Sequence, residues 1–366
     1  MAQVTVLGGG QLGRMLGLAG LPMGLTFSFL DPGAEAAAGV TGRVVNGALD
    51  DLDAARRAAA GATVITYEWE GVPAATARAL DSIAPVLPPA AALEVTQDRL
   101  AEKEACARLG IGTAAFRPVD SRADLDEAIG ALGTPAVLKS RRGGYDGKGQ
   151  AVLHDAAAAD RAWNDLGGVP LILEAFVPFT RECSIVAVRG HDGEIRCWPA
   201  VENEHRDGIL RVTRAPARGH DDALQEAAEA CIVPLLDALD YVGVGCVELF
   251  DLDGGLLANE IAPRVHNSGH WTIEGAETSQ FENHLRAVLH WPLGSTAARG
   301  PAAMVNCIGT MPDRDALLTI PGVHVHDYGK APRPGRKLGH VTITAPDEDR
   351  LEERLAAVLQ IVPSEP

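Results

Sequence analysis

The sequence lacks a hydrophobic stretch long enough to cross a bilayer as a helix, which takes about 18 uninterrupted apolar residues. Its closest candidate, Leu16 to Leu30, is interrupted by Gly17, Gly20, Pro22 and Gly24. The N-terminus also lacks the basic start and the cleavage site of a signal peptide. We therefore expect a cytoplasmic protein with no membrane partner.

Close-spaced cysteine pairs are missing too, which argues against a cysteine zinc site. Because cysteines of cytoplasmic proteins stay reduced, we interpret all six as buried free thiols. They are Cys106, Cys183, Cys197, Cys231, Cys246 and Cys307.

Positive charge is scarce: 32 Lys and Arg stand against 49 Asp and Glu, a formal net charge of −17. Neutralising a nucleic acid backbone needs a basic face, so this balance argues against a nucleic-acid partner. An anionic small substrate would need local basic contacts. Lysine is the rarer cation, and where arginine supplies nearly every other charge, lysines mark candidate sites for a compact charge. The five lysines are Lys103, Lys139, Lys148, Lys330 and Lys337.

The length of 366 residues exceeds what one hydrophobic core usually serves and predicts two or three domains. The first hundred residues alternate strand-like and alanine-rich helical runs, which predicts a parallel sheet covered by helices. A helix is expected from Leu93 to Leu109, with Gly110 at its end. From Pro135 onward the pattern changes to hairpins, including an expected pairing of 171–177 with 182–189.

A glycine-rich turn at 8–13, Gly-Gly-Gly-Gln-Leu-Gly, follows the first strand with the spacing of a dinucleotide site. Asp31 ends the next strand, where an acid for the ribose would stand. By itself this pattern predicts an NAD-dependent dehydrogenase. Its physics is less specific, because a glycine turn before a helix accepts any phosphate, including a sugar phosphate. A tight turn without a ligand is the third interpretation.

A second glycine-rich loop, 144–149 (Gly-Tyr-Asp-Gly-Lys-Gly), lies between two strand-like runs, and Lys139 ends the first of them. Gly149 follows Lys148 where a Walker A loop has Ser or Thr, so the loop is a different type. We expect a flap whose N–H groups and Lys148 close over the phosphates of ATP and exclude water. An ordinary flexible hairpin is the alternative.

The run 171–177 predicts an apolar strand that ends in a polar-edged turn, which suits an adenine slot. Backbone groups would read the ring edge, and Glu174 or Glu182 would accept hydrogen bonds from hydroxyl or amine donors. Taken alone, either glutamate is more often a solvated strand residue.

Two glutamates, Glu248 and Glu260, lie on opposite sides of an expected hairpin turn at 253–255. A three-residue loop would pair residue 252 with 256 and bring Glu248 directly opposite Glu260. Opposed like charges destabilise a hairpin unless a cation lies between them, and Mg²⁺ fits this role. A two-residue turn would instead pair Glu248 with Asn259.

These patterns, with the segment 259–270 (Asn-Glu-Ile-Ala-Pro-Arg-Val-His-Asn-Ser-Gly-His), resemble the 5-(carboxyamino)imidazole ribonucleotide synthases, a family of ATP-grasp ligases. The resemblance covers nearly the whole chain. It implies a homodimer and an α/β and α+β fold of three domains. These are a Rossmann-like pre-ATP-grasp domain (1–96), an ATP-grasp domain (97–296) with a glycine-rich lid at about 115–175, and a small C-terminal domain (297–366).

The resemblance also implies roles for individual residues. The ATP site would comprise Arg99, Lys139, Gly144, Tyr145, Asp146, Gly147, Lys148, Gly149, Gln150, Glu174, Ala175, Phe176, Val177, Glu182, His205, Asn259 and Glu260. The ribonucleotide and bicarbonate would contact Gln11, Leu12, Glu70, Tyr145, Asp146, Arg264, His266, Asn267, Ser268, Lys330, Arg336 and Lys337. Glu248 and Glu260 would hold Mg²⁺ or Mn²⁺. The catalytic group would be Lys139, Asp146, Lys148, Arg264 and His266.

The implied reaction carboxylates the exocyclic amine of 5-aminoimidazole ribonucleotide with ATP and bicarbonate, through carboxyphosphate, in purine biosynthesis. Two positions depart from the family pattern, because Gly71 replaces Asn and Val265 replaces Pro. Many other ATP-grasp enzymes have an Asn metal ligand two residues after the second glutamate, where this chain has Ala262. Two rivals remain besides the dehydrogenase. One is another ATP-grasp ligase, such as the formate-dependent glycinamide ribonucleotide transformylase, and the other is a catalytically silent binding protein.

Overall fold

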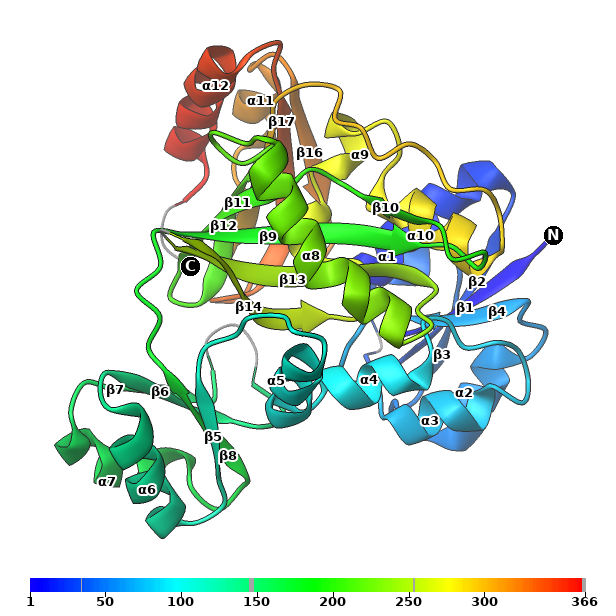
Figure 1. Cartoon of the computed structure of the whole chain (residues 1–366). Coiled ribbons are helices and arrows are strands. Elements are labelled where there is room, and N and C mark those ends of the chain that lie inside the picture. Colours follow the sequence, from blue (N-terminus) through cyan, green and yellow to red (C-terminus); the bar gives the residue numbers. More distant parts are fainter. Residues whose placement is uncertain (34, 145–147, 253, 364–366) are drawn as a thin grey trace.

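The computed structural model describes residues 1–33, 35–144, 148–252 and 254–363 (Figure 1). The chain begins with a parallel sheet in the order β3-β2-β1-β4, which confirms the predicted β-α-β rhythm. Its elements are β1 (Gln3–Leu7), α1 (Gln11–Gly20), β2 (Thr26–Asp31), β3 (Arg43–Asn46), α2 (Leu52–Ala59), β4 (Val64–Tyr67) and α3 (Ala74–Leu80).

The single helix predicted from Leu93 to Leu109 is wrong, because the segment forms two helices, α4 (Ala90–Thr96) and α5 (Arg99–Arg108). Asp98 lies between them in an extended conformation, and its carboxylate accepts a hydrogen bond from the N–H of Leu100. A side-chain acceptor at this position caps a new helix rather than continuing the old one.

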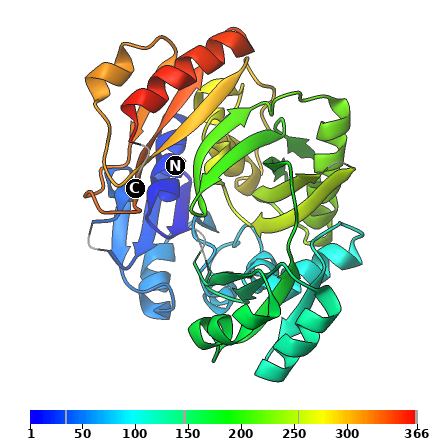
Figure 2. The same cartoon turned by 90° about the vertical axis from the view of Figure 1, so that its left-hand side faces the viewer.

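A lid subdomain follows and projects from the rest of the molecule in both views (Figures 1 and 2). Its antiparallel sheet has the order β5-β8-β6-β7, and α6 and α7 pack on it. The glycine loop joins β6 to its partner β7, as the hairpin pattern predicted. The elements are β5 (Phe116–Val119), α6 (Arg122–Leu132), β6 (Ala136–Ser140), β7 (Gln150–Leu153), α7 (Ala159–Leu166) and β8 (Leu171–Ala175).

The central sheet has the strand order β14-β13-β9-β11-β12-β15-β17-β16, with β10 beside β9. The predicted pairing of 171–177 with 182–189 is wrong, since β8 pairs with β5 and β6 whereas β9 pairs with β10, β11 and β13. The strands are β9 (Arg181–Arg189), β10 (Ile195–Cys197), β11 (Val201–Arg206), β12 (Ile209–Ala215), β13 (Gly243–Leu252), β14 (Gly255–Ala262), β15 (Ala302–Ile308), β16 (Val323–Asp327) and β17 (Lys337–Thr344).

Helices bury both faces of this sheet. Helix α8 (Asp222–Ala238) packs on β9, β13 and β14, and α10 (Gln280–Val288) contacts β13, β9 and α1. Because α10 touches α1, the N-terminal part and the central sheet share one core cluster, which includes Trp198 and Trp271. The C-terminal strands carry α11 (Arg314–Leu318) and α12 (Glu348–Ile361). Among the described helices, none is both long and apolar enough to span a membrane.

Candidate active site

A cavity of about 870 Å³ opens where the N-terminal sheet, the lid, the central sheet and the segment before β17 meet. Most of the predicted site residues lie in its wall although they are far apart in the sequence. They are Gln11, Leu12, Glu70, Arg99, Lys139, Lys148, Gln150, Glu174, Ala175, Phe176, Val177, Glu182, His205, Glu248, Asn259, Glu260, Arg264, His266, Asn267, Lys330, Arg336 and Lys337.

Five lid residues and one residue of the central region differ from this pattern. Gly144, Gly149 and Ser268 are described but do not line the cavity, and Ser268 is fully buried behind it. Tyr145, Asp146 and Gly147 lie outside the described residues. Their predicted contacts with ATP and substrate therefore stay predictions.

The two glutamates of the predicted metal site are direct partners in the β13–β14 ladder, which confirms the expected pairing. The turn predicted to produce it is wrong, because Leu252 pairs with Gly255, the register of a two-residue turn. That register alone would place Asn259 opposite Glu248. A β-bulge between Glu248 and Leu249 on one strand and Ala258 and Glu260 on the other leaves Asn259 as the extra residue and restores the glutamate pair.

The electrostatics of this pair favour a further cation beside Arg99, whose Nη1 lies 3.2 Å from Oε2 of Glu260. Burial is the main cause that raises the pKa of Glu248, and Glu260 raises it further, while His205 opposes the shift. The side-chain oxygen of Asn259 is buried and has no hydrogen-bond partner in the described part of the chain. Carboxylate and amide oxygens are ligands that Mg²⁺ accepts, so this donor set fits the ion. Within the described residues, no cluster of three or more His, Cys, Asp or Glu side chains could hold a metal.

Two side chains of helix α5 form hydrogen bonds with the backbone of the bulge. Lys103 Nζ donates to the carbonyl of Asn259 at 3.1 Å, and a carboxylate oxygen of Glu102 accepts from the N–H of Ile261 at 3.3 Å. A bulge interrupts the ladder, and buried backbone groups that it releases need other partners. Both side chains are almost fully buried, and burial, with the charge of Glu260, raises the pKa of Glu102 to about 8.

The same lysine joins a buried charge cluster at the lid. Glu174 accepts from Lys139 Nζ at 2.9 Å and lies 3.5 Å from Lys103 Nζ. Burial would raise the pKa of Glu174, but the two ammonium groups outweigh burial and lower it. Burial also lowers the pKa of Lys139. The second carboxylate oxygen of Glu174 is buried and has no hydrogen-bond partner among the described residues.

On the opposite wall, Glu182 and His205 form an ion pair, with 2.8 Å between Oε2 and Nδ1. Burial lowers the pKa of His205, but Glu182 and Glu248 raise it by more, so the net shift is upward. Phe179 and Phe250 stack beside them with ring centroids 4.6 Å apart, and both line the cavity. This pair provides a flat apolar wall near the polar groups.

The N-terminal glycine turn is occupied by a side chain of the protein itself. The carboxylate of Glu68 accepts from the N–H groups of Gly10 at 2.7 Å and Gly13 at 3.0 Å, while Asp31 accepts from Gly9 at 2.8 Å. A Cβ at Gly10 would lie 2.8 Å from that carboxylate, so glycine is needed for the close approach. The N–H groups that a pyrophosphate would need are thus already taken.

Basic side chains surround the free end of this turn. Lys330 Nζ donates to the side-chain oxygen of Gln11, and burial lowers the pKa of Lys330 to about 8. Arg264 pairs with Glu70 at 2.5 Å, which joins the predicted substrate residues of the N-terminal part to those of the segment after β14. Burial lowers the pKa of Arg264, but the acidic neighbours led by Glu70 raise it by more.

The two departures at Gly71 and Val265 have local explanations. A Cβ at Gly71 would lie 2.3 Å from Nε1 of Trp69, so the indole ring occupies the space of a side chain. Val265 is buried in the central core cluster, where its apolar side chain packs against other buried residues.

Sequence reasoning missed several residues of the site. Glu68 is two positions before the predicted Glu70, and Lys103 was marked only by the scarcity of lysine. Glu102, Phe179 and Phe250 carried no signal, since their roles depend on contacts across the fold.

Family models match three segments of the chain. Residues 1–97 match the ribonucleotide synthetase preATP-grasp domain, residues 104–281 the ATP-grasp domain, and residues 302–354 the phosphoribosylaminoimidazole carboxylase C-terminal domain. The chain is 51% identical over 360 residues to an N5-carboxyaminoimidazole ribonucleotide synthase of Pseudomonas aeruginosa, and the match covers 98% of this chain and 99% of that protein.

Solved structures agree with these matches. The crystal structure of an N5-carboxyaminoimidazole ribonucleotide synthetase from Thermus thermophilus has a TM-score of 0.96 at 54% identity, with 99% of each chain covered. An N5-carboxyaminoimidazole synthase from Aspergillus clavatus, in complex with ADP and 5-aminoimidazole ribonucleotide, has a TM-score of 0.92 at 33% identity, with 99% of this chain and 98% of that chain covered.

Proposed function

The chain belongs to the family of N5-carboxyaminoimidazole ribonucleotide synthases, and we propose that the cavity described above is where its substrates react. The protein is an ATP-grasp ligase of purine biosynthesis that converts 5-aminoimidazole ribonucleotide with ATP and bicarbonate. The fold is the three-part ATP-grasp fold, with a pre-ATP-grasp domain, an ATP-grasp domain and the C-terminal domain of this family. The finer assignments that follow, of residues, metal and assembly, are proposals.

We propose that ATP lies between the lid and the β13–β14 hairpin. Support comes from the Lys139–Glu174 pair on one side and the Glu182–His205 pair on the other, at the wall of one cavity. Phe179 and Phe250 add an apolar surface that suits a purine ring. Lys139 and Lys148 would neutralise the phosphates in a chain whose net charge of −17 otherwise repels them.

Glu248 and Glu260 would hold Mg²⁺ or Mn²⁺ beside those phosphates, with the amide oxygen of Asn259 as a further neutral donor. When bound, the ion would neutralise charge on the phosphoryl group that is transferred. Glu248 and Glu260 face each other in the ladder, and Arg99, whose Nη1 lies 3.2 Å from Oε2 of Glu260, offsets part of their repulsion. A cation bound between the two carboxylates would offset the rest, which supports the assignment.

Aminoimidazole ribonucleotide would bind at the N-terminal side, with its phosphate near the start of α1. The Glu68 carboxylate leaves the N–H groups of Gln11 and Leu12 as first-turn donors, and Lys330 reaches Gln11. Arg336 and Lys337 line the same part of the cavity. A dianionic phosphate would match this local set of cations and N–H donors.

Bicarbonate is a poor electrophile because its leaving group would be hydroxide. In the proposed sequence a bicarbonate oxygen attacks the γ-phosphorus, ADP leaves, and carboxyphosphate forms. The exocyclic amine then attacks the carboxyl carbon and loses a proton, and phosphate leaves. Arg264 and His266 would bind the carboxylate oxygens throughout, while Asp146 is a candidate to take the amine proton.

Three further proposals concern organisation. We propose a homodimer, a cytoplasmic location and domain boundaries after residues 96 and 296. Gel filtration with light scattering would measure the oligomeric state directly.

The activity is tested by phosphate release from ATP with bicarbonate, with and without aminoimidazole ribonucleotide, against formate plus glycinamide ribonucleotide. We expect release that depends on the imidazole substrate and on bicarbonate. Release only with formate and glycinamide ribonucleotide would favour the transformylase, and binding of ATP without any turnover would favour a silent binding protein.

A further inference from the structure

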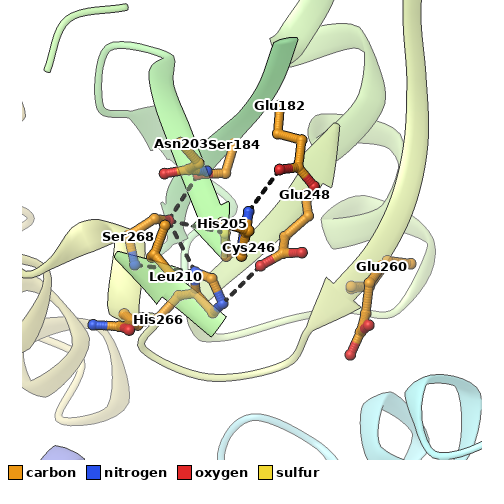
Figure 3. Close-up of polar contacts among 12 residues, drawn as sticks. Glu182, Ser184, Asn203, His205, Leu210, Cys246, Glu248, Glu260, His266 and Ser268 are labelled. Atoms are coloured by element: carbon orange, nitrogen blue, oxygen red, sulfur yellow. Dashed lines mark hydrogen bonds and ion pairs between the residues drawn. The ribbon is translucent and has the colours of Figure 1, made fainter. Parts of the chain in front are cut away.

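Buried hydroxyl and amide groups form a hydrogen-bonded chain behind His266 (Figure 3). Thr213 Oγ1 donates to Asn203 Oδ1 at 2.9 Å, and Asn203 Nδ2 donates to Ser184 Oγ at 2.9 Å. Ser184 Oγ lies 2.7 Å from Ser268 Oγ, which in turn lies 2.9 Å from His266 Nδ1. Ser184, Thr213 and Ser268 have no exposed surface, and Asn203 is 6% exposed.

One backbone group determines the direction of this chain. The N–H of Ser268 donates to Nδ1 of His266 at 3.3 Å, and a backbone N–H cannot act as an acceptor. Nδ1 must therefore be unprotonated, so the hydroxyl of Ser268 also donates to it. Ser268 has only one proton to give and must accept from Ser184, which for the same reason accepts from Asn203.

The other end of the ring points into the cavity. With Nδ1 as an acceptor, the neutral ring carries its proton on Nε2, which lies 3.4 Å from Oε1 of Glu248. Ser184 is the direct ladder partner of Glu248 on β9, and Glu260 is its partner on the other side. The two ends of the ring are thus fixed against the same row of the central sheet.

We propose that Ser268, Ser184 and Asn203 are positioning residues that hold His266 as the Nε2–H tautomer, so that His266 donates a hydrogen bond into the cavity. In the reaction this N–H binds an anionic oxygen of bicarbonate or carboxyphosphate, and His266 does not act as a general base. This role rests on the proposed function, whereas the tautomer and its cause do not.

Chemistry supports a positioning role over simple packing. Buried, hydrogen-bonded polar side chains stabilise a fold little more than buried apolar side chains of the same shape would. The cost of removing the polar groups from water offsets the gain from their hydrogen bonds. A hydrogen-bonded shell is instead the usual means of fixing a histidine tautomer and ring orientation, and its loss typically costs about 10–100-fold in activity at metal sites.

The first experiment determines the tautomer of His266 directly and does not depend on enzymatic activity. Two-bond ¹⁵N–¹H correlation spectra of histidine-labelled protein, with His266 assigned by comparison with His266→Gln, show which ring nitrogen is protonated. We expect a proton on Nε2 in the wild type and a mixture of tautomers in Ser184→Ala. A proton on Nδ1 in the wild type overturns the proposal, even if the enzyme is fully active.

The second experiment reads the reaction. We expect Ser184→Ala to lower kcat/KM for bicarbonate by about 10–100-fold, with KM for ATP within about twofold and with rescue in Ser184→Thr, which restores the hydroxyl. The matched control is Thr342→Val, which removes another buried hydroxyl of the central sheet. Equal losses in Ser184→Ala and Thr342→Val would overturn the positioning role.

Two substitutions of His266 distinguish its role as a hydrogen-bond donor from a role as a general base. Glutamine at 266 keeps an N–H donor but no base, so His266→Gln should retain about tenfold more activity than His266→Leu, a difference of one ordinary hydrogen bond. Equal losses in both variants would contradict the donor role. Absence of bicarbonate-dependent turnover in the wild type would instead refute the proposed function and leave the tautomer result standing.

Discussion

Glu248 on β13 lies directly opposite Glu260 on β14, and the pairing depends on the extra residue Asn259. The turn alone sets a register that would place Asn259 opposite Glu248, and the bulge shifts it by one residue. A shift of one residue turns every following side chain to the other face of a strand. The bulge therefore decides that two carboxylates, rather than a carboxylate and an amide, face each other at the cavity.

Removing one carboxylate tests the metal assignment. We expect Glu260→Gln to lower ATP turnover by at least about 10²-fold, because the loss of preorganised charge at a phosphoryl-transfer site has effects of this size. Circular dichroism and thermal unfolding should stay close to wild type. The control Glu277→Gln removes an exposed glutamate and should have normal turnover; near-normal turnover in Glu260→Gln would rule out its metal role.

Lys103 is expected to matter for both stability and the metal. Lys103→Met leaves the Asn259 carbonyl without its donor and Glu174 with one lysine, so the free energy of unfolding should fall by about 3 kcal/mol. If the bulge loses its anchor, half-maximal activity should also require more Mg²⁺. Urea denaturation and Mg²⁺ titration measure the two effects, with the exposed Glu104→Gln on the same helix as the control. An unchanged Mg²⁺ requirement would show that Lys103 acts on stability alone.

We expect the binding of the ribonucleotide to depend on pH because of Lys330. Burial lowers the pKa of its ammonium group from 10.5 to about 8, so the free enzyme loses this charge as pH rises through about 8. We expect KM for aminoimidazole ribonucleotide to rise above that pH, and Lys330→Arg to move the rise to higher pH, since arginine stays charged. Steady-state kinetics from pH 6.5 to about 9.5 would measure it; a KM independent of pH would contradict a contact between Lys330 and the phosphate.

The same shift has a consequence for stability, with a definite sign. Between pH about 8 and 10.5 the unfolded chain keeps a proton on Lys330 that the folded chain has lost. This group therefore makes the free energy of unfolding increase with pH across that interval, and Lys330→Met should remove the contribution. Denaturation at pH 8 and pH 10 compares the two proteins.

The N-terminal turn should not bind a dinucleotide. Glu68 and Asp31 already accept the N–H groups of Gly10, Gly13 and Gly9. We expect no saturable NADH fluorescence change at millimolar concentration, while a fluorescent ATP analogue binds with one site per chain. Stoichiometric NADH binding that ATP does not displace would overturn the interpretation of this turn.

The sequence predicted several features of the site correctly. The alternating β-α-β pattern implies a parallel N-terminal sheet. Its apolar strands are removed from water only when the intervening helices cover the faces of the sheet. The apolar runs on either side of the glycine loop pair as the hairpin β6–β7, since adjacent strands joined by a loop pair antiparallel. The segment 259–270 identified the family, because its order of residues is specific.

Other features were decided only by the tertiary structure. The G-x-G-x-x-G spacing specifies a turn that an anion can approach. In this protein the anion is the carboxylate of Glu68, which reaches the turn from the end of β4. The local spacing of the glycines does not encode that contact. The sequence shows that residues 248 and 260 are both glutamates, but not that they face each other. Their register depends on a bulge in β14 that Lys103 and Glu102 of helix α5 contact through hydrogen bonds. Patterns along the chain fix which backbone conformations are accessible; which donor meets which acceptor is settled when distant segments pack and each buried polar group must find a partner.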